Sequence, residues 1–364
     1  MRVQLRTVRQ PRDDGAIAVI VAILSVVLVL MAAFAVDLAN AYAVKRQLSV
    51  AADAAALDAA RAVAVAQSGG QPILGGGRGC AGWTATQRAA AQTAAEDVAS
   101  ATNTANDLSG NSDVDAVVIT CVGDSRVEVR VDNSRELPVF FGGVANISSI
   151  EPKRSATAAV IPRLSVGGLR PYGACNTVVQ EAQAAPGETF VMDLDNKIGI
   201  CNTTKPGNWG VVDFDGGSNP LGDIAKWTTD GYPNPVVAPS SNLPGDPGMP
   251  GPGKIDGPLS GLIDQVVLFP VVSGYAAPSK GGDNARFNLV GFVGAKVCAY
   301  RLNNKVDTGS CYDAAKAAPY NASKVNYIQF QYVSYSTGYS GGGPTCSFTN
   351  PSCRFAILSA QLYR

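Results

Sequence analysis

The sequence contains no histidine among its 364 residues. Imidazole is the usual general base near neutral pH and the most common zinc ligand in proteins. Ser-His-Asp triads, Cys-His pairs and HExxH metal sites are therefore excluded as the chemistry of this chain. Catalysis by lysine, by carboxylates or by cysteine is not excluded by the missing imidazole.

The sequence also lacks an excess of charge of either sign, because 29 lysines and arginines balance 29 aspartates and glutamates. Nucleic-acid binding normally depends on a strongly basic surface. We therefore expect no nucleic-acid partner. The length allows one large domain or, more commonly, two.

The cysteines lack the close spacing of a metal-binding motif. None of the eight forms a CxxC pair, and even Cys346 and Cys353 have six residues between them. A zinc site made only of thiolates normally shows close pairs, so we expect disulfides in an oxidising compartment and no metal. The predicted pairs join cysteines that are neighbours in the sequence: Cys80–Cys121, Cys175–Cys201, Cys298–Cys311 and Cys346–Cys353.

A long hydrophobic run extends from Ala16 to Val36, and Ser25 is its only polar residue. About 20 apolar residues cross a hydrocarbon core of ~30 Å, so the run predicts a transmembrane anchor. Four arginines precede it, at positions 2, 6, 9 and 12, and Asp37 follows it. The positive-inside rule then places residues 1–15 in the cytoplasm and the bulk of the chain outside.

A cleaved signal peptide is the alternative for the same run, because Ala33-Phe34-Ala35 offers small residues for a cut at Ala35. The run is longer than a typical signal-peptide core, and no glycine or proline interrupts the chain from Ala16 to Gln67. We therefore expect one helix of about 75 Å that continues beyond the membrane. Small apolar residues recur every three or four positions in its second half, which predicts either packing on its own domain or a seam for assembly. They are Val44, Leu48, Ala51, Ala55, Ala59 and Ala62.

The residues of this helix also form a distinctive string, with Gly15 before the apolar run and the sequence AADAAALDAA beginning at Ala51. The segment resembles the N-terminal part of the TadE/TadG-like proteins, which belong to the tight-adherence (Flp) pilus assembly system of bacteria. The positions that match the family motif are Asp37, Tyr42, Leu48, Ala52, Asp53, Ala55 and Leu57.

The resemblance implies a single-pass protein of the bacterial cell membrane, pilin-like, without catalysis and without a cofactor. Its implied partners are the membrane and other pilus assembly components or pilin-like subunits. Related prepilins are cut after a glycine and carry Glu five positions beyond the cut. Here the cut would fall between Gly15 and Ala16, but the fifth residue is Ile20. This departure favours the TadG-like branch, which is not cleaved there.

Many TadG-like proteins also carry a von Willebrand A domain with a D-x-S-x-S metal loop, and no such loop occurs in this sequence. The nearest acidic cluster extends from Asp213 to Ser218. Its glycines come too early for an EF-hand calcium loop. A turn is therefore the preferred interpretation, and a cation site is the alternative.

The remaining sequence predicts an α+β fold, in which the long helix packs on a small antiparallel sheet and a mostly β, disulfide-containing domain follows. The first part has a helix over 84–101 and strands over 114–121, 126–131 and 137–141. The second part has strands over 211–214, 265–272, 287–300, 326–334 and 356–363. Prolines and glycines in 162–171 mark the boundary. The predicted domains are a basic N-terminus (1–15), an anchor (16–36), a pilin-like domain (37–163) and an extracytoplasmic β domain (164–364).

We therefore expect a non-enzymatic, membrane-anchored, pilin-like component with no small-molecule substrate. The alternative is an anchored adhesin or surface-binding module whose C-terminal domain contacts glycans. Clustered tyrosines would give such a module aromatic contact area, although half-buried packing is the other interpretation. They are Tyr320, Tyr327, Tyr332, Tyr335 and Tyr339. An exported enzyme is the third hypothesis, but no spacing of lysines or carboxylates converges on a site.

Overall fold

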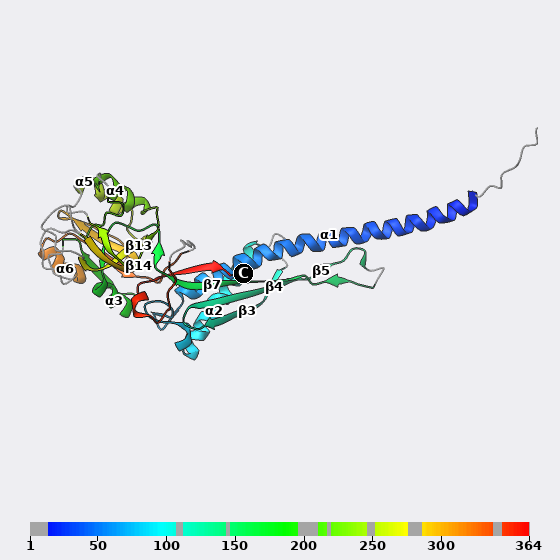
Figure 1. Ribbon diagram of the computed structural model, residues 1–364, viewed down its shortest axis with the longest axis horizontal. Helices are drawn as coiled ribbons and strands as arrows, with labels where there is room; N and C mark the ends of the chain where they lie inside the picture. The colour runs from blue at the N-terminus through cyan, green and yellow to red at the C-terminus, as the bar shows by residue number, and fades with distance from the viewer. Residues whose placement is uncertain are drawn as a thin grey trace, which may run out of the picture.

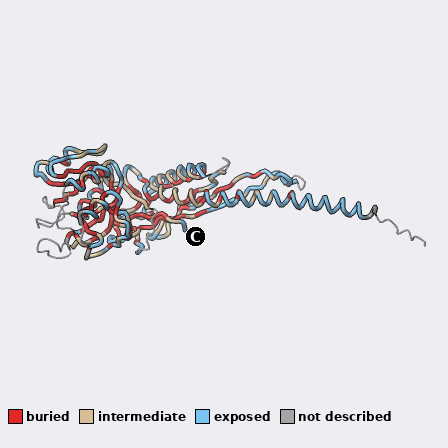
Figure 2. Tube along the Cα trace, turned by 90° about the horizontal axis from the view of Figure 1, so that it is seen from above, coloured by how far each residue is buried: buried red, intermediate tan, exposed pale blue. Residues whose placement is uncertain are grey.

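The long N-terminal helix is present as predicted. The computed structural model describes residues 14–106, 112–142, 146–195, 210–216, 220–245, 252–275, 286–337 and 344–363. Helix α1 (Asp14–Val65) is unbroken over 52 residues, which corresponds to about 78 Å at the usual rise per residue. Its first half projects from the rest of the molecule (Figure 1) and is exposed along its length (Figure 2). Its second half packs on the body of the protein.

The body begins with two helices on a five-stranded sheet. Helix α2 (Ala85–Asn106) packs against α1 and against the edge strand β3. A capping box starts α2, because Gln87 N donates to Thr84 Oγ1 and Thr84 N donates to Gln87 Oε1. The strand order is β17-β18-β7-β4-β3, antiparallel except for the β17–β18 pair. The strands are β3 (Ser112–Val122), β4 (Arg126–Arg135), β7 (Lys153–Arg163), β17 (Ser336–Thr337) and β18 (Ile357–Leu362).

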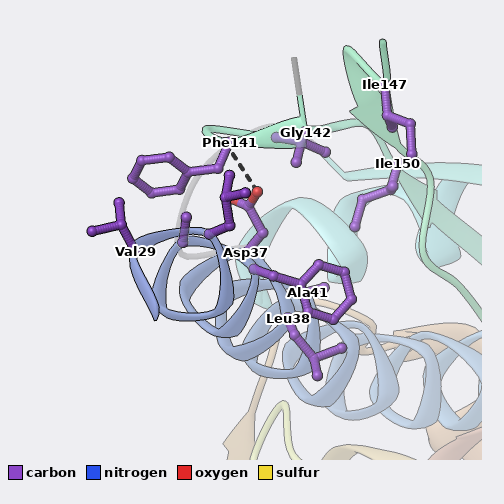
Figure 3. A pocket seen from close by; sticks show the side chains of 12 residues that line it. Val29, Asp37, Leu38, Ala41, Phe141, Gly142, Ile147 and Ile150 are labelled. Atoms are coloured by element: carbon purple, nitrogen blue, oxygen red, sulfur yellow. Dashed lines mark hydrogen bonds between the residues drawn. The ribbon is translucent and has the colours of Figure 1, made fainter. Parts of the chain in front are cut away.

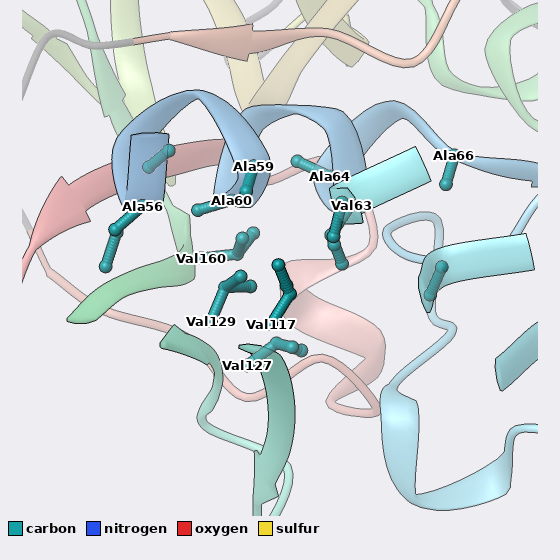
Figure 4. Packing of buried hydrophobic residues seen from close by; sticks show 14 of the residues in the cluster. Ala56, Ala59, Ala60, Val63, Ala64, Ala66, Val117, Val127, Val129 and Val160 are labelled. Atoms are coloured by element: carbon teal, nitrogen blue, oxygen red, sulfur yellow. The ribbon is translucent and has the colours of Figure 1, made fainter. Parts of the chain in front are cut away.

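This sheet and α1 share a core of small side chains. Figure 4 shows alanines and valines of α1 facing valines of β3, β4 and β7. Because alanine buries little area, close approach of the backbones stabilises this layer more than the size of each side chain does. A polar contact joins the two helices at Asp58, whose carboxylate accepts hydrogen bonds from Arg61 Nη1 (2.8 Å) and from Thr102 Oγ1 of α2 (3.2 Å).

The C-terminal region is built on a second, seven-stranded sheet. Its main path is β10-β16-β14-β13-β9, and β12 and β15 also pair with the long strand β14. The strands are β9 (Ala174–Cys175), β10 (Thr189–Asp193), β12 (Ser240–Pro244), β13 (Val266–Tyr275), β14 (Arg286–Leu302), β15 (Lys305–Thr308) and β16 (Tyr327–Tyr332). Four short helices lie around it: α3 (Asn176–Ala184), α4 (Pro220–Asp230), α5 (Pro252–Ser260) and α6 (Ala314–Ala322).

Three two-stranded pairs and two short 3-10 helices complete the described elements. The pairs are β1 (Gln67–Ser68) with β2 (Gln71–Pro72), β5 (Leu137–Pro138) with β6 (Ser149–Ile150), and β8 (Ser165–Val166) with β11 (Val236–Val237). The 3-10 helices are Cys80–Gly82 and Pro351–Cys353. The β5–β6 hairpin extends along α1 away from the sheets (Figure 1).

The predicted α+β class is confirmed, and four details differ from the sequence-based expectation. The Ala- and Ser-rich segment after residue 150 forms a central strand, β7, which was not predicted. Strand β18 was expected in the C-terminal β domain, but it pairs with β7 in the first sheet. The predicted strand over 211–214 is reduced to isolated bridges at Val211 and Val212. The four short helices after residue 164 were also not predicted.

Candidate membrane-proximal site

The first half of α1 presents a continuous apolar surface. From Ile17 to Val36 every side chain is exposed except Ala33. The one hydroxyl group in this stretch is satisfied inside the helix, because Ser25 Oγ donates to the carbonyl oxygen of Ala22 at 2.8 Å. Of the described helices, α1 is the one that is long and apolar enough to cross a membrane. Its surface is suited to lipid or to apolar helices rather than to water.

The β5–β6 hairpin meets α1 where this apolar half ends. The base of the hairpin packs on the helix through Leu137, which forms a small buried cluster with Val44 and Leu48. Nearer the tip, the Asp37 carboxylate accepts two backbone hydrogen bonds, from Phe140 N and Phe141 N, each at 3.0 Å. Figure 3 shows the contact between Asp37 and Phe141. The two backbone donors satisfy a carboxylate next to an apolar surface, and they fix the hairpin to one level of the helix.

An apolar groove of about 480 Å³ lies between the hairpin and the helix. Figure 3 shows Val29, Leu38 and Ala41 on the helix side and Phe141 and Ile150 on the hairpin side. Asp37 is the one charged side chain of the twelve that line it, and the remaining lining is aliphatic or aromatic apart from Gly142. The groove therefore offers apolar contact and no set of polar groups that would select a hydrophilic ligand.

Gly142 allows the hairpin to close. A Cβ atom at this position would lie 2.7 Å from the backbone oxygen of Ile147 and 2.5 Å from Val139 Cγ1. Ile147 N donates to the oxygen of Gly142 at 3.0 Å across this narrow point. A side chain at position 142 would force the two arms of the hairpin apart and remove the hydrogen bond between Ile147 N and Gly142 O.

The family-motif positions of α1 separate into two groups in the structure. Ala52 and Ala55 are buried in the core between α1 and the first sheet, and Leu57 is partly buried against it. Leu48 is buried in the small cluster with Val44 and Leu137. Tyr42 is 72% exposed, Asp53 is half-buried, and Asp37 bonds the hairpin. The possible processing positions Gly15, Ala16 and Ala35 all lie within the unbroken helix, and Ala35 is exposed.

The described disulfides join the same cysteines that the sequence analysis pairs. The bonds are Cys80–Cys121, Cys298–Cys311 and Cys346–Cys353. Cys175 is also disulfide-bonded, and its predicted partner Cys201 lies outside the described residues. Cys80 and Cys121 belong to the core between α1, α2 and the first sheet, so this bond ties the glycine-rich segment after α1 to strand β3.

The described part of the acidic cluster forms a turn. Asp213 Oδ1 accepts a hydrogen bond from Gly216 N at 3.1 Å. Burial, with Asp215 nearby, raises the pKa of the Asp213 carboxyl above its usual value. Ser218 lies outside the described residues. No group of three or more Cys, Asp or Glu side chains within the described ranges is arranged to hold a metal ion.

The clustered tyrosines form no exposed aromatic patch among the described residues. Tyr327 is fully buried and packs near Tyr320, with ring centroids 5.9 Å apart. Tyr332 and Tyr335 are partly buried against the cores of the C-terminal region. Tyr339 lies outside the described residues. The described members support the packing interpretation.

Neither the hairpin nor its groove is predicted as a site from the sequence. A signal was available in the composition, because residues 137–150 contain no charged side chain. The segment was interpreted as a strand over 137–141, and nothing in its spacing predicts that it meets α1 near Asp37. The contact joins residues about 100 positions apart in sequence.

Comparison with known protein families gives a match within α1. Residues 15–62 match the model of a protein family described as "Putative Flp pilus-assembly TadE/G-like". The match supports a role in pilus assembly and a membrane-anchoring helix, in a family that is generally structural rather than enzymatic. It does not separate a TadG-like from a TadE-like branch, so the TadG-like assignment stays a prediction. No curated protein and no solved structure matches the chain.

Proposed function

We propose that the chain is a non-enzymatic, membrane-anchored, pilin-like component of a Flp-type pilus assembly system, and that it acts through lateral contacts of α1 within the membrane. One observation carries the proposal: the segment that matches the family contains an exposed apolar half and a half buried in the protein's own domain. The buried half is occupied by intramolecular packing, so the exposed half is the part of α1 available to other subunits.

The proposed orientation places residues 1–15 in the cytoplasm and the two sheet-containing regions outside the membrane. The arginines before the anchor support this orientation through the positive-inside rule. The disulfides agree with an exported body. As domains we propose the anchor (16–36), a pilin-like region (37–163) to which β18 contributes a strand, and the extracytoplasmic region from residue 164.

We also propose that the N-terminal segment is retained. The bond after Ala35 lies inside a continuous helix, where a protease would first have to unwind the chain. The intact mass of the protein extracted from membranes should include residues 1–15. A mass that corresponds to a chain beginning at Ala16 or at Val36 would contradict retention and would identify the cleavage site.

Site-specific photocrosslinking in cells tests the lateral contact. A photoreactive amino acid in place of Leu28, exposed in the apolar half, should crosslink to other membrane components of the pilus system. The matched control is the same substitution at Val50, which is also exposed on α1 but lies beyond the anchor. Crosslinking from position 50 alone would place the contact outside the membrane and contradict the proposal. Normal pili and adhesion after deletion of the gene would refute the pilus role itself.

A further inference from the structure

Phe140, Phe141 and Ile147, which we call the hairpin tip, are large apolar side chains exposed next to the apolar half of α1. Phe140 is 71% exposed, and Phe141 and Ile147 are each nearly half exposed. Residues 137–150 contain no charged side chain, and the nearest charges are Glu136 and Glu151, just outside the hairpin. Contiguous exposed apolar surface of this kind marks a contact with another apolar phase or partner.

The hairpin tip lies at the level where α1 leaves the hydrocarbon core. Residues 16–36 of a helix extend about 31 Å, which matches the thickness of that core. Asp37 is the first residue beyond the run, and it holds the backbone of Phe140 and Phe141 at its own level. The helix side of the groove extends from Val29 to Ala41, a distance of about 18 Å along the axis. More than half of that distance lies within the expected hydrocarbon layer.

Four described backbone amides of the hairpin, at Val139, Phe140, Phe141 and Ile147, are paired within the protein. Hydrocarbon penalises unpaired N–H groups by several kcal/mol each, so a segment that enters it must satisfy them internally. Val139 N donates to Ser148 O, and Ile147 N donates to Gly142 O. The amides of Phe140 and Phe141 donate to Asp37. An extended loop without these partners would not satisfy that requirement.

We propose that the β5–β6 hairpin is a membrane wedge whose tip inserts into the outer leaflet beside α1, so that lipid acyl chains fill the groove. The inference rests on the membrane-spanning part of the proposed function, and it is independent of the pilus role. Lipid is favoured as the occupant because the groove is continuous with the exposed apolar surface of α1. In addition, both oxygens of Asp37, the one charged side chain in its lining, are already bonded.

The wedge has a mechanical consequence for the anchor. If α1 were the sole element in the membrane, it could slide or tilt until flanking polar residues stopped it. A second apolar element beside the helix at the level of Asp37 fixes both the depth of α1 and the rotation of the body about it. The exported region would then be held at one height and one angle above the bilayer.

Depth-dependent fluorescence quenching of the full chain in phosphatidylcholine nanodiscs tests the wedge. The variant Phe140→Trp places the probe at the hairpin tip, and the emission of the parent protein is subtracted. Leu24→Trp reports on the anchor, and Val118→Trp reports on an exposed site of β3, which belongs to neither the anchor nor the hairpin. The lipids carry bromine near the acyl carbonyl or near the chain end, and iodide is the quencher in water.

We expect emission from position 140 to shift to the blue and to be quenched most strongly by bromine near the acyl carbonyl. Position 24 should be quenched most by bromine near the chain end, and position 118 by iodide alone. If position 140 is quenched by iodide and not by bromine while position 24 responds to bromine, the wedge is refuted and the anchor stands. If position 140 is shielded from both quenchers, protein covers the exposed end of the hairpin and the lipid proposal is overturned. If position 24 also fails to respond to bromine, the spanning helix and the wedge both fail.

Discussion

The second half of α1 is the part of the helix whose partner the structure identifies, and substitution of Ala59 tests that partner. Ala59 has no exposed surface and faces the first sheet in Figure 4. The change Ala59→Leu adds three carbon atoms to a layer of closely packed alanines and valines. Extra carbons in a filled core typically cost about 1–3 kcal/mol, because neighbouring side chains or the backbone must move.

The expected loss of stability should make local opening of the core between α1 and the first sheet more favourable. Because ~1.4 kcal/mol is tenfold in an equilibrium constant, the opening equilibrium should rise roughly 5-fold to 150-fold. Hydrogen–deuterium exchange of the full chain in detergent, followed by mass spectrometry, measures this change in peptides of α1 and β4. Peptides from β13 and β14 in the other sheet serve as an internal reference and should exchange as in the parent.

The matched control is Ala43→Leu, the same substitution at an exposed position of the same helix. It should leave exchange in α1 and β4 close to that of the parent, because surface substitutions usually change stability by less than ~0.5 kcal/mol. Equal and negligible effects of both variants would refute the reasoning. In that case the alanine face would be free in the protein and available as an assembly seam, which is the alternative left open by the sequence.

Three further predictions concern other parts of the chain. Replacing both cysteines by alanine should destabilise the protein more at Cys80–Cys121 than at Cys346–Cys353. The two bonds close loops of 41 and 7 residues, which correspond to about 4 and about 2 kcal/mol of chain entropy in the unfolded state. Denaturant midpoints of the two variants measure this difference, and a larger loss of stability at Cys346–Cys353 would contradict the prediction. Hydrogen bonds from Lys305 and then Tyr300 lower the pKa of Asp256, so its contribution to stability is present above the unfolded pKa of about 3.9 and is lost as pH falls through the lower folded value. Asp256→Asn should therefore flatten the loss of stability below pH ~4, and an unchanged acid profile would show that this pair contributes nothing. Asp37→Ala should release the hairpin tip and speed amide exchange in peptides covering residues 137–142, whereas unchanged exchange would show that packing of Leu137 alone holds the hairpin.

Sequence reasoning succeeded where the signal was local. The apolar run and the alanine periodicity of α1 depend only on residues within one helix, and they predicted its length and part of its buried face. The periodicity did not include Ala56, Ala60 or Val63, which are also fully buried. The predicted start of α2, at residue 84, is one residue from the observed start at Ala85. Thr84 and Gln87 form the capping box at this end of the helix. The described disulfides join cysteines that are neighbours in sequence order, so closeness along the chain was sufficient information.

The missed elements depend on contacts that the sequence pattern does not contain. Strand β7 includes Ala156, Ala158 and Ala159, which have low strand propensity, and it becomes a strand because β4 and β18 bond it on both sides. Helices α5 and α6 contain Pro258 and Pro319, and short helices with internal prolines have weak sequence signals. In these cases tertiary packing outweighs local preference.

The membrane-proximal site could be predicted only in part from the sequence, because it also depends on contacts between distant segments. Asp37 was singled out as a family-motif position, but its role requires the partner amides of Phe140 and Phe141. Backbone donors leave no trace in the amino-acid sequence. Only the uncharged composition of residues 137–150 indicated a segment suited to an apolar environment, and composition alone does not say which surface the segment meets.

The two halves of α1 limit how a subunit of this kind could join an assembly. If the whole helix were to enter a bundle of helices, the core between α1, α2 and the first sheet would have to open, and the buried alanine and valine surface of that sheet would be exposed. The exposed half can make helix contacts with no such cost, because every side chain from Ile17 to Val36 except Ala33 is exposed and the hairpin lies beside its outer end. Lateral assembly therefore requires only the membrane-embedded turns. The hairpin covers one side of their outer end, so neighbouring helices can approach only from the remaining sides.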